Sequence, residues 1–214
     1  MNFVHAAHIN QAVREAKKQP DAILLDAGCS DGEFFFRMDE QYRFAVGLDH
    51  NPEALQTLKE RLPQESVQVM QGDICNLSFS DDTFDVVCCL ETLEHVYDMP
   101  KAVQELHRVL KKGGKIIITV PIERGFSVLL KQGVAKLFFG GYRGSYTWRE
   151  LFYAFTGQLD KIERVSLSSH KGFDYQNVHD EILKYFENIH TSGLPFKPFS
   201  TFLNTQFFIS AEKR

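Results

Sequence analysis

Short apolar runs recur along the first 121 residues, separated by segments of helical periodicity. The runs lie at 23–25, 44–48, 67–70, 84–90 and 115–121. Each has the length of a strand, and the almost continuous apolar character of 84–90 is typical of a strand covered on both faces. Strands that alternate with helices predict an α/β domain built on a parallel, doubly wound sheet.

The helical segments between these runs carry start and stop signals. A helix opens at 31–38, and Pro52 suits the first turn of the next one, where leucines recur at helical spacing. A helix over about 99–110 is expected to stop at Gly113 and Gly114. Residues 1–18 have the polar pattern of an amphipathic helix and lack the apolar core of a signal peptide.

The regular alternation of strand-like runs and helical segments ends near residue 121. No linker or repeat separates residues 1–121 from residues 122–214. We therefore expect a single domain over 1–214, with a cofactor-binding core at 1–121 and an acceptor-binding elaboration at 122–214 that also completes the sheet. Thr147 is the expected N-cap of a helix. The elements predicted in this part are helices at 126–139, 148–155 and 178–189, strands near 162–167 and 205–211, and a stiff loop at 194–198.

The segment Ile23 to Glu33 joins the first strand to the first helix through a glycine-rich turn. Gly28 and Gly32 let the backbone approach a ligand, and the free N–H groups of the helix face it. The spacing alone leaves three interpretations open. These are a small-molecule site, a hydrolase nucleophile elbow with Ser30 as nucleophile, and an ordinary tight turn.

An acidic residue stands at the carboxyl end of each of the first three strands. These residues are Asp26, Asp49 and Asp73. Because the carboxyl ends of parallel strands surround the ligand in an open sheet, the three acids are expected to meet in one crevice. Asp49 stands 21 residues after Gly28, near the position of an acid that binds ribose hydroxyls; its alternative role is to cap the next helix.

Composition narrows the class of protein. A net charge of −4 and a pI near 6.1 disfavour nucleic acid as a partner, and lysines near 101–115 are expected to form a solvated face. No apolar run is long enough to cross a bilayer. The four cysteines lack metal-ligand spacing, which predicts reduced thiols and a cytoplasmic location.

Taken together, five segments of residues 23–121 resemble the core of the class I S-adenosylmethionine-dependent methyltransferases, in the small-molecule, type 11-like branch. They are LLDAGCSDG, GLDHNPEAL, GDI, FDVVCCLETLEHV and HRVLKKGGKIIITVP. The resemblance implies a Rossmann-like α/β fold with a seven-stranded sheet, mostly parallel with one antiparallel C-terminal strand. Ser30 departs from the pattern, which more often has glycine there.

The resemblance also implies a cofactor site for S-adenosyl-L-methionine, with S-adenosyl-L-homocysteine as the product. The turn would hold the methionine part, Asp49 the ribose hydroxyls and Asp73 the adenine amino group. A dinucleotide oxidoreductase is the weaker interpretation, because Gly-x-Gly-x-x-Gly is absent. The expected cofactor-binding residues are Asp26, Gly28, Cys29, Ser30, Gly32, Asp49, His50, Asp73, Ile74 and Leu90.

The methyl transfer itself needs alignment of the acceptor and a base where the acceptor must lose a proton. His95, just past the fourth strand, is the first candidate for that base; a structural helix-cap histidine is the alternative. Glu91 and Glu94 would orient cofactor or acceptor, or lie on a solvated turn. Glu91-x-x-Glu94-His95 also resembles the signature of magnesium-dependent O-methyltransferases, although the same string occurs in relatives with no known metal, and no further ligand is evident in the sequence.

These observations predict methyl transfer to a small-molecule or lipid-like acceptor, with oxygen as the expected atom. An inactive cofactor-binding partner or regulatory domain is the alternative. The apolar segment 126–139 is expected to be a helix packed on the sheet; a lid or an interfacial helix giving peripheral membrane contact are the alternatives. His170 and His179 are within possible reach of the pocket, but lone histidines are usually structural.

Overall fold

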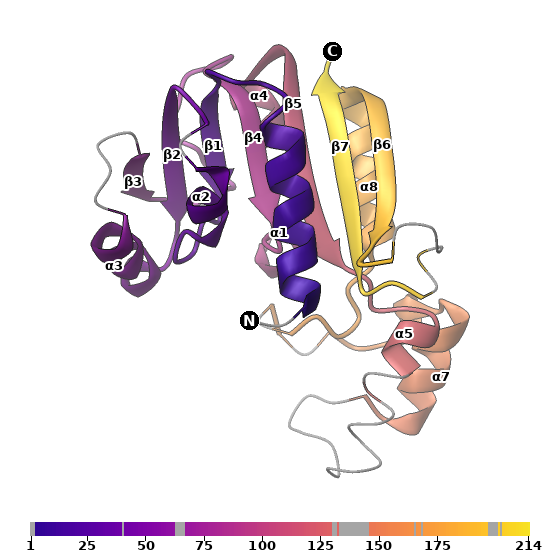
Figure 1. Cartoon of the computed structure of the whole chain (residues 1–214). Coiled ribbons are helices and arrows are strands. Elements are labelled where there is room, and N and C mark those ends of the chain that lie inside the picture. Colours follow the sequence, from indigo (N-terminus) through magenta and orange to yellow (C-terminus); the bar gives the residue numbers. More distant parts are fainter. Residues whose placement is uncertain are drawn as a thin grey trace.

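The computed structural model describes residues 3–39, 41–62, 67–129, 132, 146–164, 166, 167, 169–196, 201 and 203–214. Its centre is a seven-stranded sheet in the order β3-β2-β1-β4-β5-β7-β6 (Figure 1). β7 runs antiparallel to both of its neighbours, and the other strand pairs are parallel. The prediction of a mostly parallel, doubly wound sheet with one antiparallel strand is confirmed. The strands are β1 (Ile23–Ala27), β2 (Phe44–Asp49), β3 (Val67–Gln71), β4 (Phe84–Leu90), β5 (Leu110–Pro121), β6 (Phe186–Leu194) and β7 (Gln206–Lys213).

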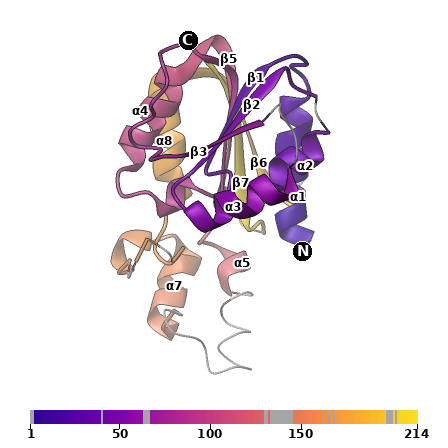
Figure 2. The same cartoon turned by 90° about the vertical axis from the view of Figure 1, so that its left-hand side faces the viewer.

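Helices cover both faces of this sheet. In Figure 2, α4 and α8 lie against one face and α1, α2 and α3 against the other, while α5 and α7 lie beyond the end of the sheet. Figure 1 places α5 and α7 next to the carboxyl ends of the parallel strands, where the candidate site is expected. The helices are α1 (Phe3–Ala16), α2 (Glu33–Met38), α3 (Pro52–Arg61), α4 (Met99–Val109), α5 (Phe126–Val128), α7 (Trp148–Thr156) and α8 (Tyr175–Tyr185), with short 3-10 turns η1 (Leu93–His95) and η3 (Leu159–Lys161).

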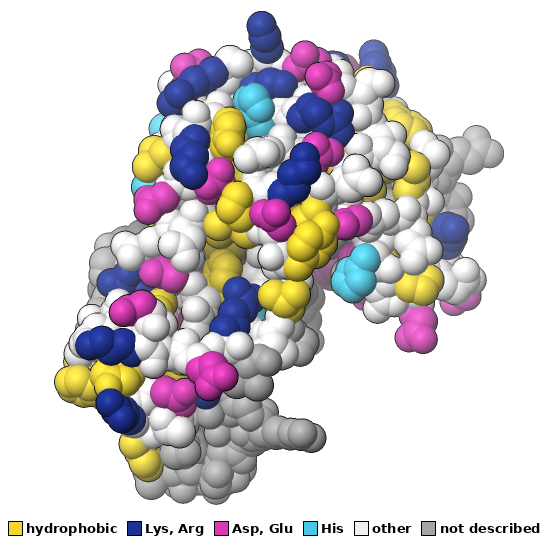
Figure 3. All heavy atoms as spheres, turned by 180° about the vertical axis from the view of Figure 1, so that it is seen from behind, with side chains coloured by type: hydrophobic (Ala, Val, Ile, Leu, Met, Phe, Trp, Pro, Cys, Tyr) yellow, Lys and Arg dark blue, Asp and Glu magenta, His cyan; other side chains and the backbone are white. Residues whose placement is uncertain are grey.

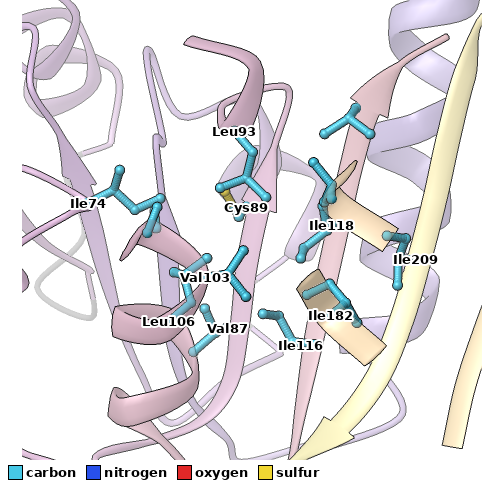
Figure 4. Close-up of a cluster of buried hydrophobic side chains, with 14 of the residues drawn as sticks. Ile74, Val87, Cys89, Leu93, Val103, Leu106, Ile116, Ile118, Ile182 and Ile209 are labelled. Carbon is cyan, nitrogen blue, oxygen red and sulfur yellow. The ribbon is translucent and has the colours of Figure 1, made fainter. Parts of the chain in front are cut away.

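Alternation along the strands builds a separate apolar layer on each face. In β4, Val87 and Cys89 belong to the cluster under α4 and α8, while Val86 and Cys88 belong to the cluster under α1, α2 and α3. Figure 4 shows Val87 and Cys89 among the side chains of the first layer. The four cysteines are free and buried. Burial on both faces explains why the strands read as continuous apolar runs.

The carboxyl-terminal third contains the main departures from the sequence prediction. The strand expected near 162–167 is wrong, because the described residues of this stretch form no strand. The helix expected over 178–189 ends at Tyr185, and Phe186 begins β6. β6 pairs with β7 through a bulge between Glu187 and His190. Long-range pairing with β7 thus overrides the local helical pattern.

Two boundaries shift near the middle of the chain. The helix expected over 99–110 is confirmed but ends at Val109, and β5 begins at once at Leu110 instead of Lys115. Leu110 pairs with Phe84, next to a register shift in the pairing of β4 with β5. The glycines expected to stop the helix therefore lie inside β5. Gly113 has a φ of 71°, which lies in the left-handed region that glycine tolerates.

The elements that follow β5 carry their own small core. Thr147 caps α7 in a reciprocal capping box with Glu150, as expected. Tyr146, Leu151 and Ile162 are among the buried members of this cluster. Of the apolar helix expected over 126–139, the structure shows α5 at its start; most of the remaining segment lies outside the described residues, together with the lid and membrane alternatives.

Among the residues that the structure describes, the face of α4 and α8 carries no patch of a single charge sign. Lysine and arginine side chains alternate there with aspartate and glutamate (Figure 3). Arg108 of α4 pairs with Glu105 at 2.7 Å and with Asp81 at 2.9 Å, and Lys111 pairs with Asp85 at 2.7 Å. Among the described residues, no helix has the length and apolar character needed to span a bilayer.

Candidate active site

The carboxyl ends of β1, β2, β3 and β4 border a cavity of about 620 Å³. This volume lies within the range of small-molecule sites. Apolar side chains form much of its wall and three acids, Asp49, Asp73 and Glu91, stand among them, so the site combines apolar contact with specific acceptors. The lining residues are Gly28, Ser30, Leu48, Asp49, His50, Asp73, Ile74, Leu90, Glu91, Thr92, His95, Val96 and Tyr97.

The turn after β1 is shaped by its glycines. Gly28 and Gly32 have φ values of 89° and 85°, and Ser30, with a φ of 48°, also adopts the left-handed region. The N–H groups of Gly28 and Cys29 both donate to the Leu48 carbonyl, at 2.7 and 3.0 Å. A side chain on Gly28 would come within 2.1 Å of the hydroxyl oxygen of Thr92. The turn is therefore closed tightly against the neighbouring strand ends.

Asp49 joins the turn after β1 to the helix after β2. Its Oδ2 accepts the N–H of Ser30 and its Oδ1 accepts the N–H of Asn51, both at 2.9 Å. Asn51, rather than Asp49, caps α3 through its side chain. Asp49 is buried, with remaining lone pairs for ligand hydroxyls, while the neighbouring His50 is largely exposed at the rim.

Asp73 also lines the cavity. Its Oδ1 accepts the N–H of Cys75 at 2.8 Å, and its Oδ2 accepts the hydroxyl of Tyr97 at 3.2 Å. Ile74 also lines the cavity. Tyr97 was missed by sequence reasoning, because it lies in an irregular segment with no motif of its own and meets Asp73 only through the fold.

Asp26 does not line the large cavity. It borders an adjoining cavity of about 100 Å³, to which α1 contributes His8 and Ile9. Its Oδ1 is buried and accepts no hydrogen bond from the described residues. Burial first, and then the charge of Asp49, raise the pKa of Asp26 to about 8.

Two predicted cofactor residues lie behind the wall instead of on it. Cys29 borders only the smaller cavity, and burial raises the pKa of its thiol. Gly32 precedes α2, and a side chain there would meet Leu58 at 2.1 Å. Leu90 borders both cavities, and its carbonyl accepts the hydroxyl of Thr92 at 3.0 Å.

The predicted catalytic residues cluster where β4 enters η1. Glu91 Oε2 accepts the side-chain amide of Gln206 at 3.0 Å, and Gln206 Oε1 in turn accepts from His8 Nδ1 at 2.8 Å. Glu94 is fully buried, while His95 borders the cavity. Burial, followed by the charge of Glu91, raises the pKa of Glu94 well above its ordinary value. This end of the cavity therefore brings acids and imidazoles together.

A further histidine joins this end from the loop before α8. His170 Nε2 lies 3.9 Å from Glu94 Oε1, and its ring centroid lies 5.2 Å from that of His95. His179, which sequence reasoning also named, instead packs against Phe207, 6.0 Å between ring centroids. No local sequence signal separates these two histidines, because only the path of the chain decides which one reaches the site.

Residues 25–118 match the family model described as a methyltransferase domain. A 2-phytyl-1,4-naphtoquinone methyltransferase of Nostoc punctiforme is 32% identical over 121 residues, covering 53% of each chain. Residues 25–118, which make up less than half of the chain, are therefore similar to the methyltransferase domain family. A demethylmenaquinone methyltransferase of Alkalihalophilus pseudofirmus is 26% identical to this chain, covering 67% of each chain.

Solved structures share the fold of this chain across nearly its whole length. A protein of Pyrococcus horikoshii matches with a TM-score of 0.68 and 17% identity, covering 98% of this chain and 90% of that one. The N-methyltransferase NodS of Bradyrhizobium japonicum, solved with S-adenosyl-L-homocysteine, matches with a TM-score of 0.64 and 13% identity, covering 99% and 88%. By sequence, the matched stretch spans about half the length of the first curated relatives.

The cavity residues fit the family's cofactor. S-adenosylmethionine presents vicinal hydroxyls, an adenine ring and an ammonium group, and carries no phosphate. Asp49 and Asp73 supply acceptors at separate points of the wall, and Ile74 supplies apolar contact between polar groups. Oδ1 of Asp26, which accepts no hydrogen bond from the described residues, supplies a further acceptor in the adjoining cavity. An acceptor-rich, anionic wall suits a cationic cofactor.

Proposed function

We propose that this protein moves the methyl group of S-adenosylmethionine to a small aromatic or lipid-like acceptor, at an oxygen. The observation that carries the proposal is the cavity that places Asp49 and Asp73 along one wall and His95 at its rim. Bound cofactor supplies an activated methyl group. The protein's part is to align the acceptor, exclude water and accept a proton.

Cofactor binding is assigned to the strand ends. Asp49 would accept hydrogen bonds from the ribose hydroxyls, because its two oxygens are already oriented by the Ser30 and Asn51 N–H groups. Asp73 would accept from the adenine amino group, with Ile74 against the ring. Asp26, together with the turn that begins at Gly28, would face the methionine part.

His95 is assigned the role of base. Its Nδ1 lies 2.6 Å from the Leu167 carbonyl, which can only accept, so Nδ1 carries the proton and Nε2 keeps its lone pair. A phenolic oxygen that loses its proton to Nε2 becomes a better nucleophile. The quinone methyltransferases among the relatives support a quinone-derived ring as the acceptor.

The proposal is tested by measuring S-adenosylhomocysteine formation with a panel of naphthoquinols and catechols. Acceptors whose hydroxyls are already methylated serve as chemical controls. Turnover with a free hydroxyl, and an O-methyl product identified by NMR, are expected. A C-methyl product would contradict the oxygen assignment. Binding of S-adenosylhomocysteine without turnover of any acceptor would favour the inactive partner domain instead.

A further inference from the structure

Three side chains meet beside the part of the cavity that His95 lines. We call this part the acceptor end, because the proposed acceptor would lie there. Glu94 and His95 come from η1 after β4, and His170 comes from the loop before α8, about 75 residues later in the chain. One potential ligand atom of each lies within 4.8 Å of the other two. Glu91 lies outside this group, so the cluster differs from the one that its sequence motif suggests.

The environment of the Glu94 carboxylate is the main support for a ligand at this cluster. Its side chain has no exposed surface, and neither carboxylate oxygen receives a hydrogen bond among the described residues. A buried carboxylate without a donor is costly, because the lost hydration is not replaced. Two histidine nitrogens lie near Oε1, His95 Nε2 at 3.7 Å and His170 Nε2 at 3.9 Å.

The histidine atoms that face Glu94 are suited to accept rather than donate. His95 Nδ1 donates to the Leu167 carbonyl at 2.6 Å, which leaves the Nε2 lone pair toward Glu94. Two acceptors, the imidazole nitrogen and the carboxylate oxygen, therefore face each other. A cation between them resolves this conflict, and metal-binding histidines commonly donate their other N–H to a backbone carbonyl.

His170 shows a related arrangement with a carboxylate. Its Nδ1 lies 4.0 Å from Glu123 Oε1 and its Nε2 lies 3.9 Å from Glu94 Oε1. Glu123 is itself buried and accepts the Tyr146 hydroxyl at 2.9 Å. A proton on Nδ1, directed toward Glu123, would leave Nε2 as a second nitrogen ligand, as in carboxylate–histidine–metal groupings.

We propose that Glu94, His95 and His170 bind one divalent transition-metal ion, with Zn²⁺ as the first candidate. Two imidazoles and one carboxylate favour Zn²⁺ over Mg²⁺, which prefers oxygen ligands. Ligands at Zn bond lengths of about 2.0–2.1 Å stand about 3.4 Å apart in a tetrahedral site. The separations of 3.7 and 3.9 Å approach this value within small side-chain movements.

A cationic side chain, that of Arg164, also lies near Glu94. The Arg164 guanidinium donates to the main-chain carbonyl of Glu94 and not to its carboxylate. The alternative occupant of the cluster is therefore a proton on Glu94, which would make the acid neutral. A metal ion and a proton compete for the same oxygen, so direct metal binding distinguishes them. An ion bound here would occupy the lone pair of His95 Nε2, so proton acceptance by His95 belongs to the metal-free protein; that link rests on the proposed function, whereas the metal site does not.

The test is titration of the full chain, treated with chelator and then dialysed, with Zn²⁺ by calorimetry and with Co²⁺ by absorption spectroscopy. One ion per chain is expected, with a cobalt spectrum of nitrogen and oxygen ligands, and millimolar Mg²⁺ should not displace it. Absence of binding, tighter binding of Mg²⁺, or a thiolate charge-transfer band would overturn the proposal.

Variants locate the ion. Glu94→Gln and His170→Gln should each weaken Zn²⁺ binding at least tenfold, while His179→Gln should match the wild type. His179 is a matched control, because 33% of its side chain is exposed against 35% for His170. Equal losses in all three variants, or none in the first two, would overturn the assignment. Calorimetric binding of S-adenosylhomocysteine to each variant checks folding, and it also separates failure of the metal site from failure of the proposed function.

Discussion

Oδ2 of Asp49, at the end of β2, accepts the main-chain N–H of Ser30 at 2.9 Å. This bond ties the acid at the end of β2 to the turn after the neighbouring β1, so the two halves of the proposed cofactor site hold each other in place. The serine at a position where the family more often has glycine keeps that bond, because it needs only the main chain. Ser30 has a φ of 48°, which lies in the left-handed region that residues other than glycine adopt less readily.

Asp49→Ala should weaken binding of S-adenosylhomocysteine by about 1.4 kcal/mol or more, which is at least tenfold. The variant removes both the proposed ribose acceptor and the restraint on Ser30. Calorimetric titration of the folded variant measures the loss. Glu60→Gln, on the exposed side of α3, is the control and should bind as the wild type does. Unchanged affinity in Asp49→Ala would remove Asp49 from the cofactor site.

Gly28→Ala should destabilise the protein and weaken cofactor binding. An added Cβ meets Thr92 at 2.1 Å and also requires a φ of 89° that alanine disfavours. Gly113→Ala is a matched control, because its φ of 71° imposes similar strain while nothing lies within 4 Å of the added Cβ. Urea unfolding should show a loss of about 1 kcal/mol for Gly113→Ala and a clearly larger loss for Gly28→Ala. Equal losses would show that the contact with Thr92 relaxes freely.

Asp26→Asn should stabilise the free protein at alkaline pH and have little effect near pH 4. The folded-state pKa of about 8 exceeds the ordinary value of 3.8, so folding takes up a proton between these values and stability falls as the pH rises toward 8. Asparagine cannot ionise and avoids this loss. Urea unfolding at pH 5 and pH 8.5 should show a variant advantage that grows to about 2 kcal/mol. A difference independent of pH would contradict the raised pKa.

Glu105→Gln should have the opposite dependence on pH. Hydrogen bonds from Arg108 first, then from the Leu77 N–H and from Lys101, outweigh burial and lower the pKa of Glu105 to about 2. The carboxylate therefore contributes stability above its ordinary pKa of 4.5, and this contribution is lost as the pH falls toward 2. The variant should be less stable by about 1–2 kcal/mol at pH 7 and should converge with the wild type in acid. Parallel unfolding curves across this range would refute the account.

His95→Gln should lower kcat by about 10²-fold or more while leaving the affinity for S-adenosylhomocysteine unchanged. Glutamine retains polarity but cannot accept the proton at neutral pH. Once an acceptor is identified, steady-state kinetics beside calorimetry separate the two effects. A raised KM with unchanged kcat would assign His95 to acceptor binding instead of proton transfer.

The sequence by itself determined the parallel sheet, the turn after β1 and the line of acids at the strand ends. These features are local: apolar runs mark strands buried on both faces, and an acid at the end of a parallel strand reaches the ligand edge whatever the distant chain does. Thr147 and the capping of α7 were readable for the same reason.

Only the tertiary structure decided the last strands and the acceptor end. Residues 186–194 form a strand because β7 supplies the pairing, which outweighs a local pattern typical of a helix. The bonds from His8 to Gln206 and from Gln206 to Glu91 join segments up to 198 residues apart. His170 reaches Glu94 whereas His179 packs elsewhere, since contacts between distant segments depend on the path of the folded chain and leave no periodic trace in the sequence.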